Sequence, residues 1–182
     1  TQLSTERGVS VTPSEIAMAE LNTTAVFPNA AVEGAVRAAL GMPEGAVRKA
    51  DLMAITQLDL TGMSLSDVAF LQDYANLTSL MLGQNKIRSL EPLSVLNRLE
   101  MLSLRDNPIE DFSPIGWLKS LRSLDAASTG MTSLDGLRRN TALEWLSIAD
   151  NHLTTLEPIG AFRRLASLDA SNNQLTDLAP LA

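Results

Sequence analysis

The sequence contains no cysteine, and it has few of the other residues on which catalytic or metal chemistry most often depends. Without cysteine there are no disulfides, thiolate metal ligands or cysteine nucleophiles. A single histidine, His152, leaves little scope for histidine-based metal binding or acid–base catalysis. No apolar run approaches the ~18 residues that a membrane-spanning helix needs. These absences predict a protein that is not an enzyme, binds no cofactor or metal and does not insert into a membrane.

What remains is an aliphatic and acidic chain. Of its 182 residues 45% are hydrophobic but only 4% are aromatic, so the core must be aliphatic. The 21 acidic residues exceed the 14 basic ones and give a net charge of −7. This surplus of negative charge argues against a nucleic-acid partner or an anionic membrane surface.

Apolar residues recur with a period of 22 residues, which defines six repeats starting at residues 55, 77, 99, 121, 143 and 165. The first column contains Ile55, Leu77, Leu99, Leu121, Leu143 and Leu165. The second contains Leu58, Leu80, Leu102, Leu124, Leu146 and Leu168, and the third Leu60, Leu82, Leu104, Ala126, Ile148 and Ala170. Each repeat is too short to bury its own apolar face, so the repeats must stack on one another.

The spacing within a repeat predicts its local structure. The alternating Leu-x-Leu segment is typical of a short strand with one buried face, and stacked repeats pair such strands in parallel. Apolar spacings of three beyond the strand favour a 3₁₀ turn on the outer side, and prolines such as Pro92 and Pro158 forbid long helices there. The predicted fold is therefore an α/β solenoid with a parallel sheet on its concave side and short turns on its convex side.

An asparagine column follows the strands at Asn85, Asn107, Asn151 and Asn173. Buried asparagines at this place can bridge backbone groups of neighbouring turns. Met63 and Thr129 replace the asparagine in repeats 1 and 4, and Asn140 replaces a core leucine in repeat 4. We therefore expect the ladder to be broken at repeat 4, with irregular packing or curvature there.

The motif Leu99-x-x-Leu102-x-Leu104-x-x-Asn107-x-Ile109 resembles the 22-residue form of the leucine-rich repeat. The preceding residues 27–54 resemble the helical N-terminal cap of the bacterial internalin-like family. In that segment Val32, Ala35, Val36, Ala39 and Leu40 form an apolar helical stripe, Asn29 is a candidate N-cap, and Gly41 and Pro43 end the helix. The resemblance implies a right-handed leucine-rich-repeat solenoid.

The sequence thus divides into three parts. Residues 1–26 are rich in Ser and Thr and predict a linker or loosely docked arm, residues 27–54 the cap, and residues 55–182 five full repeats and a partial sixth. A solenoid is not expected to end on an open apolar face, so we expect the natural chain to continue beyond Ala182.

Residues that alternate with the buried leucines are predicted to project from the concave face. Most are small or polar, but Trp145, Met101, Met81 and Arg105 are of types enriched at binding hot spots. We predict that a partner contacts these four together with Asp125, Ser147, Ser103, Asp59 and Asp169. The alternative for Trp145 is that it packs sideways on Arg122 or Arg105. Trp117 falls on the return side, where packing or incidental exposure is expected.

Charge is unevenly distributed over the repeats. The positions flanking the strands carry seven acidic residues (Asp59, Glu100, Asp106, Asp125, Glu144, Asp150 and Asp169) but only two basic ones, Arg105 and Arg122. The rest of the repeats balances at eight acidic and eight basic residues. The concave side would attract a partner with a basic patch, unless this charge serves only solubility.

These observations predict a non-catalytic module that binds another macromolecule, most simply a protein, on its concave face. The sequence does not distinguish a protein from a glycan ligand. The internalin-like resemblance implies a secreted or cell-surface bacterial protein such as an adhesin, although the absence of cysteine suits the cytoplasm equally. The alternatives are a structural or targeting module of a longer surface protein, the recognition domain of a larger enzyme, and an intracellular scaffold.

Overall fold

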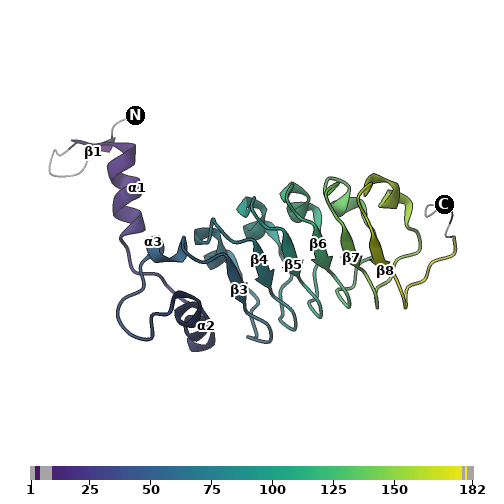
Figure 1. Cartoon of the computed structure of the whole chain (residues 1–182), viewed down its shortest axis with the longest axis horizontal. Helices are drawn as coiled ribbons and strands as arrows, with labels where there is room; N and C mark the ends of the chain where they lie inside the picture. The colour runs from purple at the N-terminus through teal and green to yellow at the C-terminus, as the bar shows by residue number, and fades with distance from the viewer. Residues whose placement is uncertain (1–2, 5–9, 178, 180–182) are drawn as a thin grey trace.

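The computed structural model describes residues 3–4, 10–177 and 179, and it shows an elongated solenoid with helices at its N-terminal end (Figure 1). The apolar positions Leu178 and Leu181 and the last residue, Ala182, lie outside the described residues. Within them, one strand and one 3₁₀ turn recur in each of the first five repeats, as the 22-residue period predicts.

Six strands form a single parallel sheet in sequence order. They are β3 (Gln57–Asp59), β4 (Ser79–Met81), β5 (Met101–Ser103), β6 (Ser123–Asp125), β7 (Trp145–Ser147) and β8 (Ser167–Asp169). Each residue pairs with the residue 22 positions later, as in Leu80 with Leu102. The register therefore follows the leucine columns without a slip.

Five 3₁₀ turns run along the opposite side of the solenoid. They are η1 (Ala69–Asp73), η2 (Glu91–Val95), η3 (Ser113–Trp117), η4 (Asp135–Leu137) and η5 (Glu157–Ala161). Proline occupies the first turn of η2, η3 and η5, where its missing N–H costs no hydrogen bond. The predicted convex side is confirmed.

The leucine columns form one continuous aliphatic core. Leu80, Leu102 and Leu124 at the strand centres are at most 1% exposed, and the core extends from the N-terminal cap to repeat 5. In repeat 6 the corresponding Leu165, Leu168 and Ala170 are only partly buried. Removing this aliphatic surface from water at roughly 25 cal/mol per Å² is the main stabilising contribution to the solenoid.

The asparagines form the expected ladder. The Asn107 side chain donates to the carbonyls of Leu82 and Leu104, both at 2.9 Å, and accepts from the backbone N–H of Ile87 at 2.9 Å. Asn85 and Asn151 repeat the pattern. Each asparagine thus satisfies polar backbone groups of two successive repeats in a place that water does not reach.

The ladder is interrupted at repeat 4, but Thr129 replaces part of it. Its hydroxyl donates to the Ala126 carbonyl at 2.9 Å. Because position 129 of the next repeat is not an asparagine, the backbone N–H of Ile109 donates to the Asn107 carbonyl instead. Asn140 is fully buried and donates to the carbonyls of Ile115 and Leu118, yet its own oxygen has no partner. The expected irregularity is therefore present between repeats 3 and 4.

The helices α2 (Ala30–Leu40) and α3 (Lys49–Leu52) cover the N-terminal end of the sheet (Figure 1). The Asn29 side chain caps α2 by accepting from the Val32 N–H at 2.9 Å, and it also donates to the Met63 carbonyl of repeat 1. Gly41 ends α2 in the left-handed conformation (φ 64°). The predicted stripe is confirmed at the fully buried Val32 and Val36 but is wrong at Ala39, which is exposed because it lies at the edge of the buried face.

Before the cap, a short antiparallel pair, β1 (Leu3–Ser4) and β2 (Ser10–Val11), precedes helix α1 (Pro13–Leu21). Thr12 caps α1 by accepting from the Glu15 N–H, and the Glu15 carboxylate accepts from the Thr12 N–H in return. No residue of α1 is buried. The helix is stabilised by its capping hydrogen bonds and contacts α3, and it does not pack on the aliphatic core.

Candidate functional site

One of the two outward-facing rows of the sheet consists of the first residue of each strand. In register it contains Gln57, Ser79, Met101, Ser123, Trp145 and Ser167. Because each is followed by a leucine that is buried, or in repeat 6 partly buried, its own side chain must point away from the core. Met101 is 42% and Trp145 41% exposed. Two large side chains therefore stand in a row of mostly small ones.

Met101 and Trp145 enclose a hollow on this face. We call this hollow the concave notch. It has a volume of about 280 Å³ and is lined by Met81, Met101, Leu102, Ser103, Ser123, Asp125 and Trp145. Ser123 pairs with Met101 on one side and with Trp145 on the other. At a strand spacing of about 4.8 Å, the two large side chains originate about 10 Å apart, with only a serine between them.

The notch is apolar on its sides and polar at one end. The Asp125 carboxylate accepts from the Ala127 N–H at 3.2 Å and makes a long hydrogen bond of 3.4 Å with the Ser103 hydroxyl. A carboxylate with two oxygens has room for further donors. The notch therefore offers apolar walls together with a negatively charged acceptor.

Five of the nine residues predicted to contact a partner line this notch: Met81, Met101, Ser103, Asp125 and Trp145. Arg105, Asp59 and Asp169 are exposed on the same sheet or just beyond it but lie outside the notch. Ser123, which was not among the predicted contact residues, lies between Met101 and Trp145. A small residue between two large ones in the same column of the sequence could have indicated this hollow.

The prediction that Ser147 projects from the concave face is wrong. The residue is only 6% exposed. Its short side chain lies between the longer side chains of Asp125 and Asp169, with which it pairs in the sheet. Little of it is left for a partner to reach.

The arginines near Trp145 are engaged with other groups. Arg122 pairs with Glu144, and the Arg105 Nε lies 3.3 Å from an Asp106 carboxylate oxygen. Among the described residues, cation–π contacts are found only at Trp117 and none involves Trp145. The sideways packing of Trp145 on an arginine is therefore absent from this part of the chain.

Three of the acidic residues on the concave side have a local structural role. Asp59, Asp125 and Asp169 end their strands, and each carboxylate accepts from the backbone N–H two residues later. Hydrogen bonds from the Ser171 hydroxyl and N–H lower the pKa of Asp169, and the charge of Arg105 contributes a smaller effect. These carboxylates stabilise the turns that leave the sheet while still presenting negative charge to solvent.

Two further acidic residues of the concave side lie in the turns that follow the strands, and the turn geometry accounts for them. Asp106 and Asp150 adopt left-handed backbone conformations (φ 56° and 57°), which aspartate tolerates better than most residues. The Asp150 carboxylate also accepts from the Asn172 side chain at 2.8 Å. Turn geometry is thus a second reason for acidic residues on this side.

The residues that the structure describes contain no group of three or more His, Asp or Glu side chains arranged to hold a metal ion. None of their helices is long and apolar enough to cross a membrane.

Comparison with known proteins agrees with this architecture. The family model described as Leucine Rich repeats (2 copies) matches residues 75–118 and 141–182. Over 77 residues the chain is 32% identical to human cilia- and flagella-associated protein 410, of whose length it spans 30%.

Similar solved structures include two internalins of Listeria monocytogenes. Internalin C2 superposes with a TM-score of 0.70 and 31% identity, and the match covers 86% of this chain and 80% of that one. The other, an internalin F, gives a TM-score of 0.67 at 24% identity, covering 86% and 60%. A leucine-rich repeat protein of Leptospira interrogans matches with a TM-score of 0.58 and 26% identity, over 71% of this chain and 41% of that one. The chain belongs to the internalin-like family of leucine-rich repeat proteins.

Proposed function

We propose that this chain is a non-catalytic module that binds another protein through the concave notch. The observation that carries the proposal is the pair of exposed side chains, Met101 and Trp145, on either side of Ser123. Neither is needed to fill the core, and Trp is among the residues that contribute most to binding at interfaces. A methionine wall adapts its shape to what it contacts.

The chemistry of the notch favours a lysine or arginine side chain from the partner. Its methylene stem would lie between Met101 and Trp145, and its charged end would reach the Asp125 carboxylate. The surplus of acidic residues along the strands would attract a basic surface over a longer range. A neutral or acidic partner would gain neither the charged contact with Asp125 nor the long-range attraction.

The internalin-like resemblance supports a secreted or cell-surface setting, in which such a module would act as an adhesin. A structural, targeting or recognition role within a longer protein uses the same contacts with a partner in the same polypeptide or complex. The adhesin is the proposal that we test.

The test is capture of a partner from host-cell and cell-wall extracts on the immobilised chain. Wild type is compared with the double variant Trp145→Ala, Met101→Ala and with a control, Met18→Ala, Met53→Ala, which removes two exposed apolar side chains that lie outside the sheet. We expect the first variant alone to lose the captured band. Equal capture by all three contradicts the proposal, and a band that survives protease but not glycosidase contradicts a protein ligand.

A further inference from the structure

A second charged surface lies outside the concave face. Six exposed basic residues fall in the last five positions of repeats 2–5, where each 3₁₀ turn leads into the next strand: Arg98, Lys119, Arg138, Arg139, Arg163 and Arg164. We call them the basic edge. None of the eight acidic residues that balance the repeat charge falls in these positions. The equal numbers of acidic and basic residues therefore conceal an uneven placement of charge within repeats 2–5.

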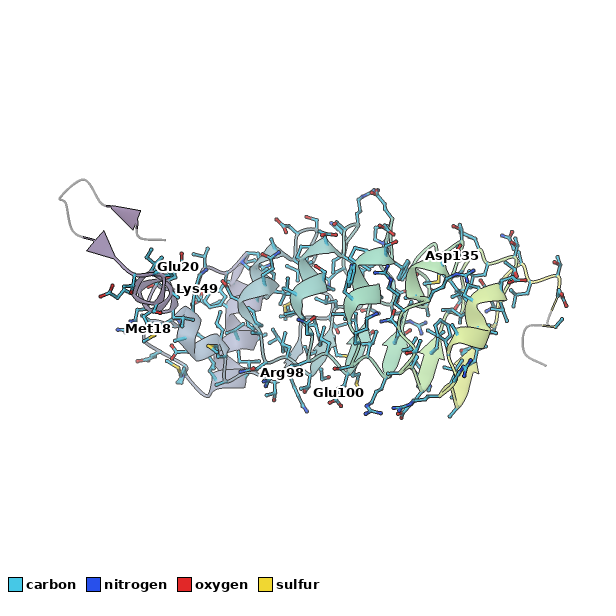
Figure 2. The ribbon with its side chains drawn as sticks, turned by 90° about the horizontal axis from the view of Figure 1, so that it is seen from above. Met18, Glu20, Lys49, Arg98, Glu100 and Asp135 are labelled. Atoms are coloured by element: carbon cyan, nitrogen blue, oxygen red, sulfur yellow. The ribbon has the colours of Figure 1, made fainter. Side chains whose placement is uncertain are left out.

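Acidic residues lie beside the basic edge at some points. Figure 2 shows Glu100 at the same edge of the solenoid as Arg98, with Asp135 of η4 at the opposite edge. Within the part of the chain that the structure describes, Arg138 forms an ion pair, with Asp135, whereas the other five members of the basic edge form none. Most of this positive charge is not neutralised within the protein.

Trp117 lies in the middle of the basic edge. It is 55% exposed, and the Arg139 guanidinium stacks over its ring with the central carbon 4.5 Å from the ring centroid. Val95, at the same position in the preceding repeat, is 51% exposed. Beside Trp117 is a hollow of about 390 Å³ lined by Ser113, Trp117, Asp135, Gly136, Arg138 and Arg139. An apolar contact surface is thus set beside the arginines, and the Asp135 carboxylate at the hollow is paired with Arg138.

We propose that the basic edge is a second docking surface, and that its occupant is an acidic peptide segment of another protein. Arginine and an exposed tryptophan together suit carboxylates interspersed with an apolar side chain, which would rest on Trp117 and Val95. The positive strip is narrow, because Glu100 and Glu144 follow it within a few residues on the way into the strands. A single extended chain fits this width.

A nucleic acid fits less well. The net charge of −7 repels a long polyanion at a distance, whereas a short acidic segment responds to the local charge within the ~8 Å over which salt screens it. Binding of single-stranded nucleic acid uses aromatic rings on which successive bases stack. Here the apolar surface consists of Val95 and of Trp117, whose ring is already stacked with Arg139.

The test uses the full chain carrying Trp145→Phe, so that Trp117 is the remaining tryptophan. The probe is a peptide with a central leucine between two runs of four glutamates, and its binding is followed by Trp117 fluorescence at low salt. We expect saturable binding that high salt abolishes, and about ten-fold weaker binding by Arg163→Gln, Arg164→Gln. The matched control is Lys86→Gln, Arg88→Gln, which removes the same charge elsewhere and should leave affinity within about two-fold.

Three results would overturn the proposal. The first is no binding of the peptide. The second is equal weakening by the two double variants, which would mean that only net charge matters. The third is tighter binding of single-stranded oligothymidylate than of the peptide, which would make the edge a nucleic-acid surface. Circular dichroism of each variant shows whether the fold is retained.

Discussion

Met101 and Trp145 stand one strand to either side of Ser123 in the same row of the parallel sheet. Both are about two-fifths exposed, and both line the concave notch with Asp125 at its polar end. The arrangement depends on the regular register, since a slip by one residue would turn both side chains into the core. The stability of the ladder and the core therefore determines whether the notch exists.

The first prediction concerns the asparagine ladder. Asn107→Ala removes a buried side chain that bonds backbone groups of repeats 2 and 3, leaving those groups unsatisfied. We expect the free energy of unfolding to fall by about 2–4 kcal/mol, measured by urea denaturation. The control is Asn97→Ala at an exposed position, which should change it by no more than about 0.5 kcal/mol. Equal effects of the two substitutions would contradict a ladder role.

The second prediction concerns the close approach of repeats 3 and 4. A Cβ at Gly136 would lie 2.8 Å from the Phe112 backbone carbon, whereas a Cβ at Gly160 in η5 would meet nothing within 4 Å. We expect Gly136→Ala to destabilise the protein by about 1–3 kcal/mol. Gly160→Ala should be neutral or stabilise it by up to about 1 kcal/mol. Thermal unfolding of both variants decides the matter, and a harmless Gly136→Ala would mean that the two repeats move apart easily.

The third prediction concerns Tyr74, the only tyrosine of the chain. Its buried hydroxyl has no hydrogen-bond partner, and burial, with a smaller effect of the Asp73 charge, raises the pKa of Tyr74 above its ordinary value. Because the folded state holds the proton more tightly, stability is unaffected below the unfolded pKa of about 10 and is lost as the pH rises from there toward the raised pKa of the folded state. We expect Tyr74→Phe to be at least as stable as wild type at neutral pH and to resist alkaline unfolding better.

Phenolate absorbance provides the measurement for Tyr74. In the folded protein it should stay absent above pH ~10 and appear together with loss of the circular dichroism signal. Ionisation near pH ~10 with the fold intact would show instead that water reaches the hydroxyl.

Much of the fold follows directly from the sequence, because each leucine column has one place in the stacked repeats. The ladder asparagines and the cap helix follow in the same way, from the residue types at Asn85, Asn107 and Asn29. Helix α1 has no such column, since it buries nothing, and only Thr12 and Glu15 of its capping box indicate it.

The candidate surfaces were harder to predict from the sequence. Alternation identifies Met101 and Trp145 as outward-facing, but the hollow between them depends on the size of Ser123, and the burial of Ser147 depends on its longer neighbours. The basic edge is hidden from a count, because acidic residues elsewhere in the repeats cancel its charge in the sum, and its members come together only when repeats 2–5 are stacked. Surface patches combine residues from several repeats, and their pattern appears only in the stacked structure.

The concave notch can be tested most directly by filling it. Ser123→Trp places a large side chain between Met101 and Trp145 without removing any wall, and Ser167→Trp adds the same side chain in the same row beyond Trp145. The measurement is the affinity of the captured partner for each folded variant by surface binding. The proposed function predicts a loss of more than about ten-fold for Ser123→Trp and near-wild-type affinity for Ser167→Trp. Unchanged affinity of the folded Ser123→Trp variant would contradict binding at the notch.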